Sequence, residues 1–133
     1  MAERVYCLYR GKDQESILMQ KNACHDFAEK KGWNIVGEEQ EIGVSGYKGS
    51  NDDLVKLKRI RKAAEQGEFD ILLVFMYDRL GRNLNETPFI AEWFTKKGIH
   101  VWSVYEGEII DGVDAERMLD YIRFWQTDEA QKL

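Results

Sequence analysis

The stretch Asp70-Ile71-Leu72-Leu73-Val74-Phe75-Met76 indicates the fold class, because six consecutive apolar residues follow the aspartate. A continuous apolar pattern of this length is typical of a strand that is covered on both faces, as in parallel sheets. The run is far too short to span a membrane, which takes about 20 apolar residues. It therefore predicts a central strand of an α/β domain.

The segments around this strand alternate between strand and helix patterns. Gly32, Gly67 and Gly98 each follow a helical pattern, at the position where a left-handed glycine commonly ends a helix. Repeated strand–helix–strand units imply right-handed crossovers. We expect a mostly parallel sheet of four to five strands in flavodoxin-like order, with helices on both faces. The expected strands are 5–9, 33–38, 70–76 and 99–105, and the expected helices are 16–31, 52–66, 87–97 and 114 to about 126.

Length and composition limit the number of domains and the compartment. With 133 residues, 44% of them hydrophobic, the chain suits one domain with its own core, and we expect that domain to span residues 1–133. Cys7 and Cys24 lie in apolar settings without metal-ligand spacing, so buried thiols are expected in preference to a disulfide. Without a signal-peptide pattern or a membrane span, a cytoplasmic location with no membrane partner is expected.

The charge of the chain bears on nucleic acid as a partner. A net charge of −5 and a pI of about 5.1 argue against a domain that grips nucleic acid by bulk electrostatics. No Ser/Gly-rich stretch and no charge run of one sign marks an internal linker. Any contact with nucleic acid would therefore have to be local, or be made by a segment outside this chain.

Chemistry is expected beyond the carboxyl ends of the strands, where ligands bind in sheets of this kind. Guanidinium groups that converge on one such edge suit phosphate oxygens. The competing interpretation is structural: Arg79 would pair with Asp78 or a helix end, and Arg82 would be a solvated surface residue. The loops expected at this edge are 10–14, 41–46, 77–83 and 106–111, and the arginines within them are Arg10, Arg79 and Arg82.

Cofactor sites are not indicated by the pattern. The residues after the first expected strand, 10–14, fit neither a dinucleotide-binding loop nor a P-loop. His25 and His100 have no matching ligands, so packing explains them better than zinc binding does. We expect neither a metal ion nor any other cofactor.

Two stretches of the chain carry recognisable motifs. Tyr77-Asp-Arg-Leu-Gly-Arg-Asn83 directly follows the apolar strand, and Gly43-Val-Ser-Gly46 follows the second expected strand. They resemble the D-R-L-x-R signature and the G-x-S-G loop of the serine site-specific recombinases, the resolvase/invertase family. Leu8-Tyr-Arg10 and Gln20 are similar to the end of that family's first strand and to a glutamine of its first helix. The resemblance covers Val5 to about Trp125 and identifies the chain as an N-terminal catalytic domain of this family.

The resemblance implies a mechanism of DNA strand cleavage and rejoining. A serine attacks a DNA phosphate and forms a 5′-phosphoserine link, and strands are then exchanged within a tetramer. Neither a metal nor ATP is required, because the covalent intermediate keeps the phosphoester energy.

The resemblance also implies roles for individual residues. Positive side chains would neutralise the charge that develops on the phosphoryl oxygens. Ser45 would help to hold the phosphate, and Asp78 would donate a proton to the leaving oxygen or orient an arginine. The residues expected to bind the DNA phosphate are Arg10, Gln14, Arg79 and Arg82.

Two departures from the family's pattern fall within the expected site. The family continues from its first-strand arginine as R-V-S, in which the serine is the nucleophile, whereas Arg10 is followed by Gly11 and Lys12. The nucleophile of this chain is therefore unknown. The family also has an arginine shortly after G-x-S-G, and residues 47–53 contain only Lys48 as a basic residue.

Three hypotheses follow. In the leading one, the chain is a recombinase catalytic domain that is active in its full-length form; a mobile loop missing from the sequence between Arg10 and Gly11 would explain the absent serine. In the second, the chain is a catalytically degenerate relative that acts by oligomerisation with active recombinases. The third is a small-molecule binder or phosphoacceptor domain, which would need acidic residues at the end of the first strand, where Tyr9 and Arg10 stand.

The last expected helix carries an apolar stripe of Met118, Tyr121, Ile122 and Trp125 at helical spacing. The stripe would pack on the sheet or, as the resemblance implies, form a dimer interface. In the family the main DNA-binding part lies C-terminal to this domain, which here means beyond Leu133. We therefore expect homodimers, tetramers in the synaptic complex, and only weak DNA binding by this chain alone.

Overall fold

A five-stranded sheet in the order β2-β1-β3-β4-β5 forms the centre of the computed structural model, which describes residues 3–42, 51–80 and 87–109. Neighbouring strands from β2 to β4 pair in parallel, and β5 pairs antiparallel with β4. This confirms the mostly parallel α/β sheet in flavodoxin-like order. The strands are β1 (Arg4–Gly11), β2 (Asn34–Ile42), β3 (Ile71–Val74), β4 (His100–Ser103) and β5 (Gly107–Ile109).

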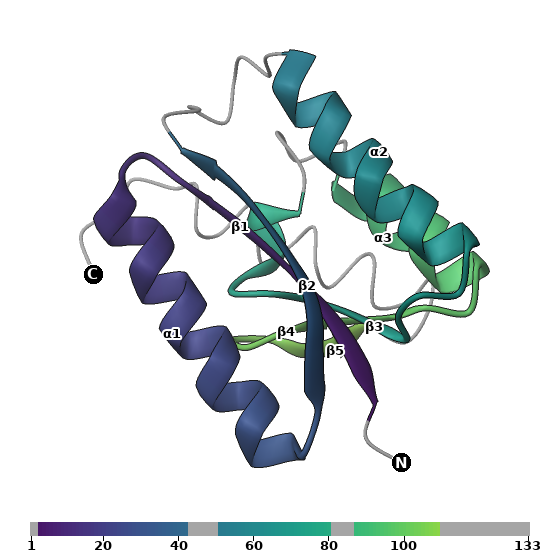
Figure 1. Cartoon of the computed structure of the whole chain (residues 1–133), viewed down its shortest axis with the longest axis horizontal. Coiled ribbons are helices and arrows are strands. Elements are labelled where there is room, and N and C mark those ends of the chain that lie inside the picture. Colours follow the sequence, from purple (N-terminus) through teal and green to yellow (C-terminus); the bar gives the residue numbers. More distant parts are fainter. Residues whose placement is uncertain (1–2, 43–50, 81–86, 110–133) are drawn as a thin grey trace.

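Helices cover both faces of the sheet (Figure 1). One face carries α1, and the other carries α2 and α3 side by side. A short 3-10 helix, η1, follows β3. The helices are α1 (Gln14–Lys31), α2 (Asn51–Glu65), η1 (Tyr77–Arg79) and α3 (Thr87–Lys96). No helix among the described residues is long and apolar enough to cross a membrane.

The hydrophobic core has one part on each face of the sheet. All four residues of β3 are buried, and they alternate between the two parts, as the alternation of side chains in a strand requires. Leu72 packs with Phe94 on the α2–α3 side, and Leu73 packs on the α1 side. The α1 side also contains Cys7 and Cys24, which are buried free thiols, as predicted.

Local residues set the helix ends. Gly32, Gly67 and Gly98 have φ angles of 74°, 69° and 83°, so all three adopt the left-handed conformation predicted for them. The first helix begins two residues earlier than expected, because the carboxylate of Asp13 accepts the N–H of Ser16 at 2.8 Å and caps the helix there.

The loops after β1 and β2 begin later than the sequence pattern predicts, whereas β3 and β4 end two residues earlier than expected, at Val74 and Ser103. β1 includes Arg10 and Gly11, β2 extends to Ile42, and η1 occupies the start of the third loop. The expectation of an irregular loop over 106–111 is wrong for its first part, because β5 pairs with β4 across a turn that ends at Gly107, whose φ is 94°. Ser45, Arg82 and the expected helix from residue 114 lie outside the described residues.

Candidate functional site

The carboxyl ends of β1, β2 and β3 meet at one edge of the sheet, the edge at which the sequence predicts ligand binding. Arg10 lies near the end of β1 and is in register with Glu41 of β2. η1, which contains Arg79, follows β3 and contacts β1. The fold thus brings the elements that carry Arg10 and Arg79 to the same edge.

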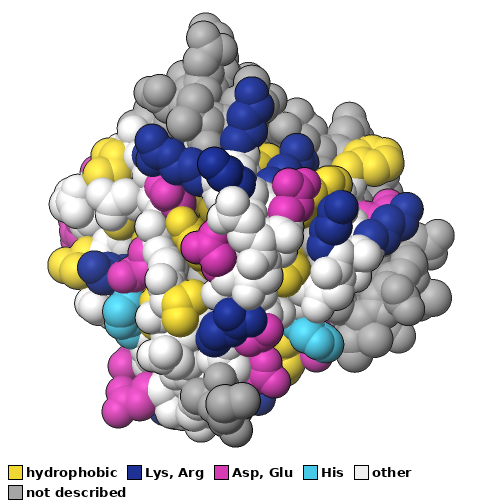
Figure 2. All heavy atoms as spheres, turned by 45° about the vertical axis from the view of Figure 1, so that its right-hand side comes forward, with side chains coloured by type: hydrophobic (Ala, Val, Ile, Leu, Met, Phe, Trp, Pro, Cys, Tyr) yellow, Lys and Arg dark blue, Asp and Glu magenta, His cyan; other side chains and the backbone are white. Residues whose placement is uncertain are grey.

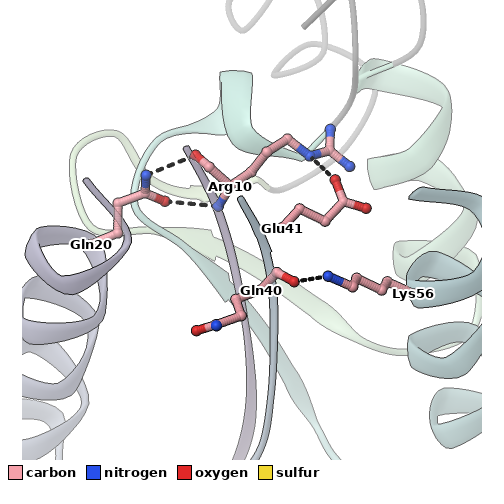
Figure 3. Close-up of polar contacts among 5 residues, drawn as sticks. All are labelled: Arg10, Gln20, Gln40, Glu41 and Lys56. Atoms are coloured by element: carbon pink, nitrogen blue, oxygen red, sulfur yellow. Dashed lines mark hydrogen bonds and ion pairs between the residues drawn. The ribbon is translucent and has the colours of Figure 1, made fainter. Parts of the chain in front are cut away.

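Arg10 forms a buried ion pair with Glu41. The Nε of Arg10 lies 3.0 Å from Oε2 of Glu41, and the two side chains are only 8% and 2% exposed (Figure 3). Among the described residues, Nη1 of Arg10 has no hydrogen-bond partner although it is buried. A buried donor without a partner is costly, so this guanidinium is suited to receive an oxygen atom from an anionic ligand.

Gln20 holds the backbone of Arg10 from the other face of the sheet. Its amide oxygen accepts the N–H of Arg10 at 3.1 Å, and its Nε2 donates to the carbonyl of Arg10 at 2.8 Å (Figure 3). Gln20 is fully buried, and its Nε2 also lies 3.3 Å from Oγ of Ser16. The glutamine therefore positions the end of β1, and with it the arginine.

β1 continues without interruption through the position at which missing residues were expected. Arg10 and Gly11 are consecutive in the full sequence and pair with the consecutive residues Glu41 and Ile42 of β2. The hypothesis that residues are missing between Arg10 and Gly11 is therefore wrong. The short connection from β1 to α1 is a property of this chain.

Ser16 occupies the space where a side chain at position 11 would lie. A Cβ atom on Gly11 would be 2.5 Å from Oγ of Ser16, which is closer than such contacts occur. Successive residues of a strand point to opposite faces, so Ser16 lies on the α1 face while the side chain of Arg10 points to the α2 face. The hydroxyl of Ser16 and the guanidinium of Arg10 are therefore separated by the sheet.

The turn between β4 and β5 anchors η1. Oε2 of Glu106 accepts the N–H of Tyr77 at 2.9 Å and the hydroxyl of Ser103 at 3.0 Å. The hydroxyl of Tyr77 donates to the carbonyl of Gly107. These bonds fix the element that carries Arg79. Sequence reasoning missed Glu106 and Glu41, and the only available signal was that each is an acidic residue at the expected edge.

The other predicted site residues are placed less completely. Gln14 is the exposed first residue of α1, at the same edge as the end of β1. Arg79 is partly buried in η1, and Asp78 is the central residue of that helix. Their roles stay predictions, as do those of Ser45 and Arg82.

A polar cluster on the α1 face joins Tyr9, His25 and Glu38. The hydroxyl of Tyr9 donates to Oε2 of Glu38 at 2.6 Å, and Nε2 of His25 lies 2.9 Å from the same oxygen. Burial raises the pKa of the Tyr9 hydroxyl. Burial also raises the pKa of the Glu38 carboxyl, but the hydrogen bonds from His25 and Tyr9 outweigh it, so the pKa lies below its ordinary value. The ring of this histidine is engaged by its contact with Glu38, which connects α1 to β2.

Comparison with protein families identifies the domain. The model of the resolvase N-terminal domain matches residues 10–129. The chain belongs to this family. The resemblance of its motifs to serine site-specific recombinases is thereby confirmed. A search of curated protein sequences found no match to the chain.

Solved structures agree with this assignment. The resolvase domain is similar to the N-terminal catalytic domain of TP901-1 integrase, with 24% identity, coverage of 93% of this chain and 96% of that chain, and a TM-score of 0.72. It is 26% identical to the C-terminal catalytic domain of ISC1926 TnpA, an IS607-like serine recombinase, over 77% of this chain and 70% of that chain, with a TM-score of 0.65. A resolvase family site-specific recombinase from Streptococcus pneumoniae is 19% identical, with coverage of 98% and 92% and a TM-score of 0.70. The two structures under 25% identity, those of TP901-1 integrase and of the Streptococcus pneumoniae recombinase, show that the chain shares their fold.

Within this resolvase domain the residues after Arg10 differ from the recombinase pattern. Gly11 has no side chain, and Lys12, the second residue after Arg10, is exposed. Asp13 then caps α1. None of these three residues carries a hydroxyl group, so the connection from β1 to α1 contains no serine nucleophile.

Proposed function

We propose that this resolvase domain takes part in site-specific DNA recombination as a non-cleaving subunit, which binds DNA and assembles with relatives that cleave it. The carrying observation is that none of the residues from Arg10 to Asp13, at the described end of β1, carries a hydroxyl group. Membership in the resolvase family supports recombination as the process, and one of the similar structures is the catalytic domain of an IS607-like serine recombinase.

The chemistry of a phosphoserine link requires a hydroxyl oxygen that can reach the phosphorus atom. At the expected position stands Lys12, whose side chain cannot form a phosphate ester. The next serine, Ser16, lies on the opposite face and is bonded by Gln20. The residues described at the end of β1 can therefore hold a phosphodiester but offer no hydroxyl to attack it.

Binding of the phosphate would rest on Arg10. Its Nη1 is a buried donor with no hydrogen-bond partner among the described residues, and Glu41 and Gln20 hold the guanidinium and the backbone in place. Glu41 also neutralises part of the positive charge. We therefore expect moderate affinity for a phosphodiester, with Arg79 contributing from η1.

The competing function is cleavage through a 5′-phosphoserine. It is favoured by the arrangement of Arg10, since a guanidinium fixed at the sheet edge would also suit the phosphoryl transition state. In this chain the hydroxyl would have to come from another segment or another subunit.

A denaturing filter-binding assay separates the two functions without knowledge of the target site. The chain is incubated with end-labelled random fragments of the genome that encodes it, and the DNA retained after SDS treatment measures covalent adducts. A recombinase with the R-V-S sequence and its own site serves as the positive control. We expect no retention above background, and a protease-sensitive adduct that Arg10→Ala abolishes would overturn the proposal.

The same assay without SDS measures non-covalent binding at low salt. We expect retention that Arg10→Ala lowers severalfold. If neither covalent nor non-covalent retention is found at low salt, DNA binding by this chain is refuted.

A further inference from the structure

Helix α2 carries a concentration of positive charge that the rest of the chain lacks. Between Lys56 and Lys62, five of seven residues are basic and none is acidic, in a chain with 24 acidic and 19 basic residues. Two apolar residues, Leu57 and Ile60, interrupt the basic ones because they pack toward the core.

The basic residues of α2 differ in whether they contact other described parts of the chain. Lys56 donates to the carbonyl of Gln40, and the guanidinium of Arg61 lies over the ring of Trp93, 5.1 Å from its centroid. Lys58 and Lys62 are exposed, and neither forms an ion pair or hydrogen bond with any part of the chain that the structure describes. Two point charges are therefore free to bind an external partner.

Arg59 adds a third positive group to this face. Its Nη1 lies 3.8 Å from Oε1 of Glu39, and its side chain is 64% exposed, so the pair is long and largely solvated. Such surface ion pairs contribute little and are easily exchanged for another anion. Lys58 and Lys62 are four residues apart, about one helical turn, so they lie on the same side of α2.

The neighbouring helix α3 extends the positive area. Lys97 lies over the same Trp93 ring as Arg61, at 5.4 Å from the centroid, so the ends of the two helices are adjacent. Acidic groups on this side include Glu65 and Glu92, and the latter is paired with Lys96 at 2.9 Å. Figure 2, in which the side of the molecule that carries α2 and α3 comes forward, shows Lys and Arg side chains gathered in its upper part.

We propose that the exposed face of α2, with Lys58, Arg59 and Lys62 at its centre, binds the phosphate backbone of duplex DNA. We call these three residues the α2 basic face. The inference rests on the proposed function for the presence of DNA, but its residues belong to a different element from Arg10. Phosphate contacts of this kind position a protein on DNA without reading the sequence.

The composition of this face favours nucleic acid over an acidic protein as the partner. Protein interfaces have a buried apolar core, whereas none of the large exposed hydrophobic side chains among the described residues belongs to α2. Lysine side chains without fixed partners, on a convex helix, match a row of phosphate charges that needs no apolar contact. A local surface of this type also agrees with the acidic charge of the whole chain, which excludes binding by bulk electrostatics.

The test measures the salt dependence of DNA binding. Fluorescence anisotropy with a labelled random duplex of about 30 base pairs gives the affinity of the complete chain over a range of NaCl concentrations. Each lost phosphate contact lowers the slope of log K against log salt by about 0.9. The double variant Lys58→Gln/Lys62→Gln should therefore reduce the slope by about 2 and weaken binding equally for duplexes of different sequence.

The matched control is Lys21→Gln/Lys30→Gln, which removes the same charge from exposed positions of α1 on the other face of the sheet. This control should change the slope by much less than the α2 variant does. Equal effects of the two variants would show general electrostatics and would overturn the inference. The inference is also overturned if the chain binds poly-glutamate as tightly as DNA and if the α2 variant weakens both interactions equally.

The variant Arg10→Ala distinguishes this inference from the proposed function. If Arg10→Ala weakens binding and Lys58→Gln/Lys62→Gln does not, the edge site stands and the α2 basic face is refuted. If only the α2 variant weakens binding, the α2 basic face stands and phosphate binding at the edge fails. Additive losses of DNA affinity in a variant that combines Arg10→Ala with Lys58→Gln/Lys62→Gln support both phosphate binding at the edge and the α2 basic face.

Discussion

Arg10 is held from both faces of the sheet, and this determines what the residue can do. Gln20 bonds its backbone from α1, and Glu41 pairs with its guanidinium on the other side. A buried ion pair contributes little net stability, because desolvation of the two charges offsets their attraction. Its effect here is to fix one edge of the guanidinium, while Nη1, which has no hydrogen-bond partner among the described residues, is the atom that we propose binds the phosphate.

The variant Glu41→Ala should destabilise the domain and make its stability depend on anions. Removal of one partner leaves the charge of Arg10 buried and unpaired, which typically costs about 3–5 kcal/mol. Inorganic phosphate should restore part of this loss, since it can replace the carboxylate. Urea unfolding with and without phosphate measures both effects. Equal stabilisation of the variant and the original chain by phosphate would count against an anion site at Arg10.

Gly11 and Ser16 should show strong energetic coupling. A methyl group at position 11 would collide with the side chain of Ser16, so Gly11→Ala should cost about 1–3 kcal/mol through overpacking. In the double variant Gly11→Ala/Ser16→Gly the space is vacant and most of this cost should disappear. A double-mutant cycle by chemical denaturation gives the coupling energy, and additive losses would contradict the packing shown by the structure.

At the scale of elements, pairing between strands corrected the boundaries that the sequence pattern indicated. The pattern predicts a first strand that ends at Tyr9 and a second that ends at Glu38, because polar residues follow both positions. β1 and β2 extend each other to Gly11 and Ile42, since every added residue of one finds a backbone partner in the other. The helix ends at Gly32 and Gly98 were predictable, because they depend on the conformation of a single residue.

Arg4, the first residue of β1, donates hydrogen bonds to Asp70, which directly precedes β3. The contribution of these bonds to the stability of the fold should depend on pH. The hydrogen bond from the Arg4 side chain, together with that from its backbone N–H, lowers the pKa of the Asp70 carboxyl. A carboxyl whose folded pKa is lowered stabilises the fold above its unfolded pKa, and the contribution is lost as the pH falls through the folded value.

The variant Asp70→Asn should therefore be less stable than the original chain at neutral pH, and the difference should vanish at pH values below the folded pKa of Asp70. The difference should be small, because both side chains are substantially exposed. Thermal unfolding from neutral to strongly acidic pH measures it. A difference that stays constant over this range would show that the ionised carboxylate contributes nothing.

At the scale of the whole molecule, the distribution of charge determines the expected strength and salt dependence of DNA binding. The net charge is −5, yet the α2 basic face is locally positive, and the edge of the sheet carries the guanidinium of Arg10 beside Glu41. Two local contacts on an acidic body give a weak complex that salt dissociates readily, because few counterions are released on binding.

The chain alone should therefore bind duplex DNA only weakly at physiological salt, with a Kd no tighter than about 10⁻⁶ M, the strong end of the usual non-specific range. Binding should become detectable as the salt concentration is lowered. A gel-shift titration at both salt concentrations checks this expectation. Tight binding at physiological salt would mean that more phosphates are contacted than the two surfaces can account for.

The sequence by itself determined the α/β class, the position of most helices and strands, and the family, because these depend on periodic patterns and on motifs of adjacent residues. The sequence also shows that no serine follows Arg10 directly, but not on which face of the sheet the next serine, Ser16, lies. Only the tertiary structure decided that Glu41 pairs with Arg10, that Ser16 lies on the opposite face, and that Glu106 anchors η1. These relations join residues distant in the chain, and strand register and sheet order bring them together.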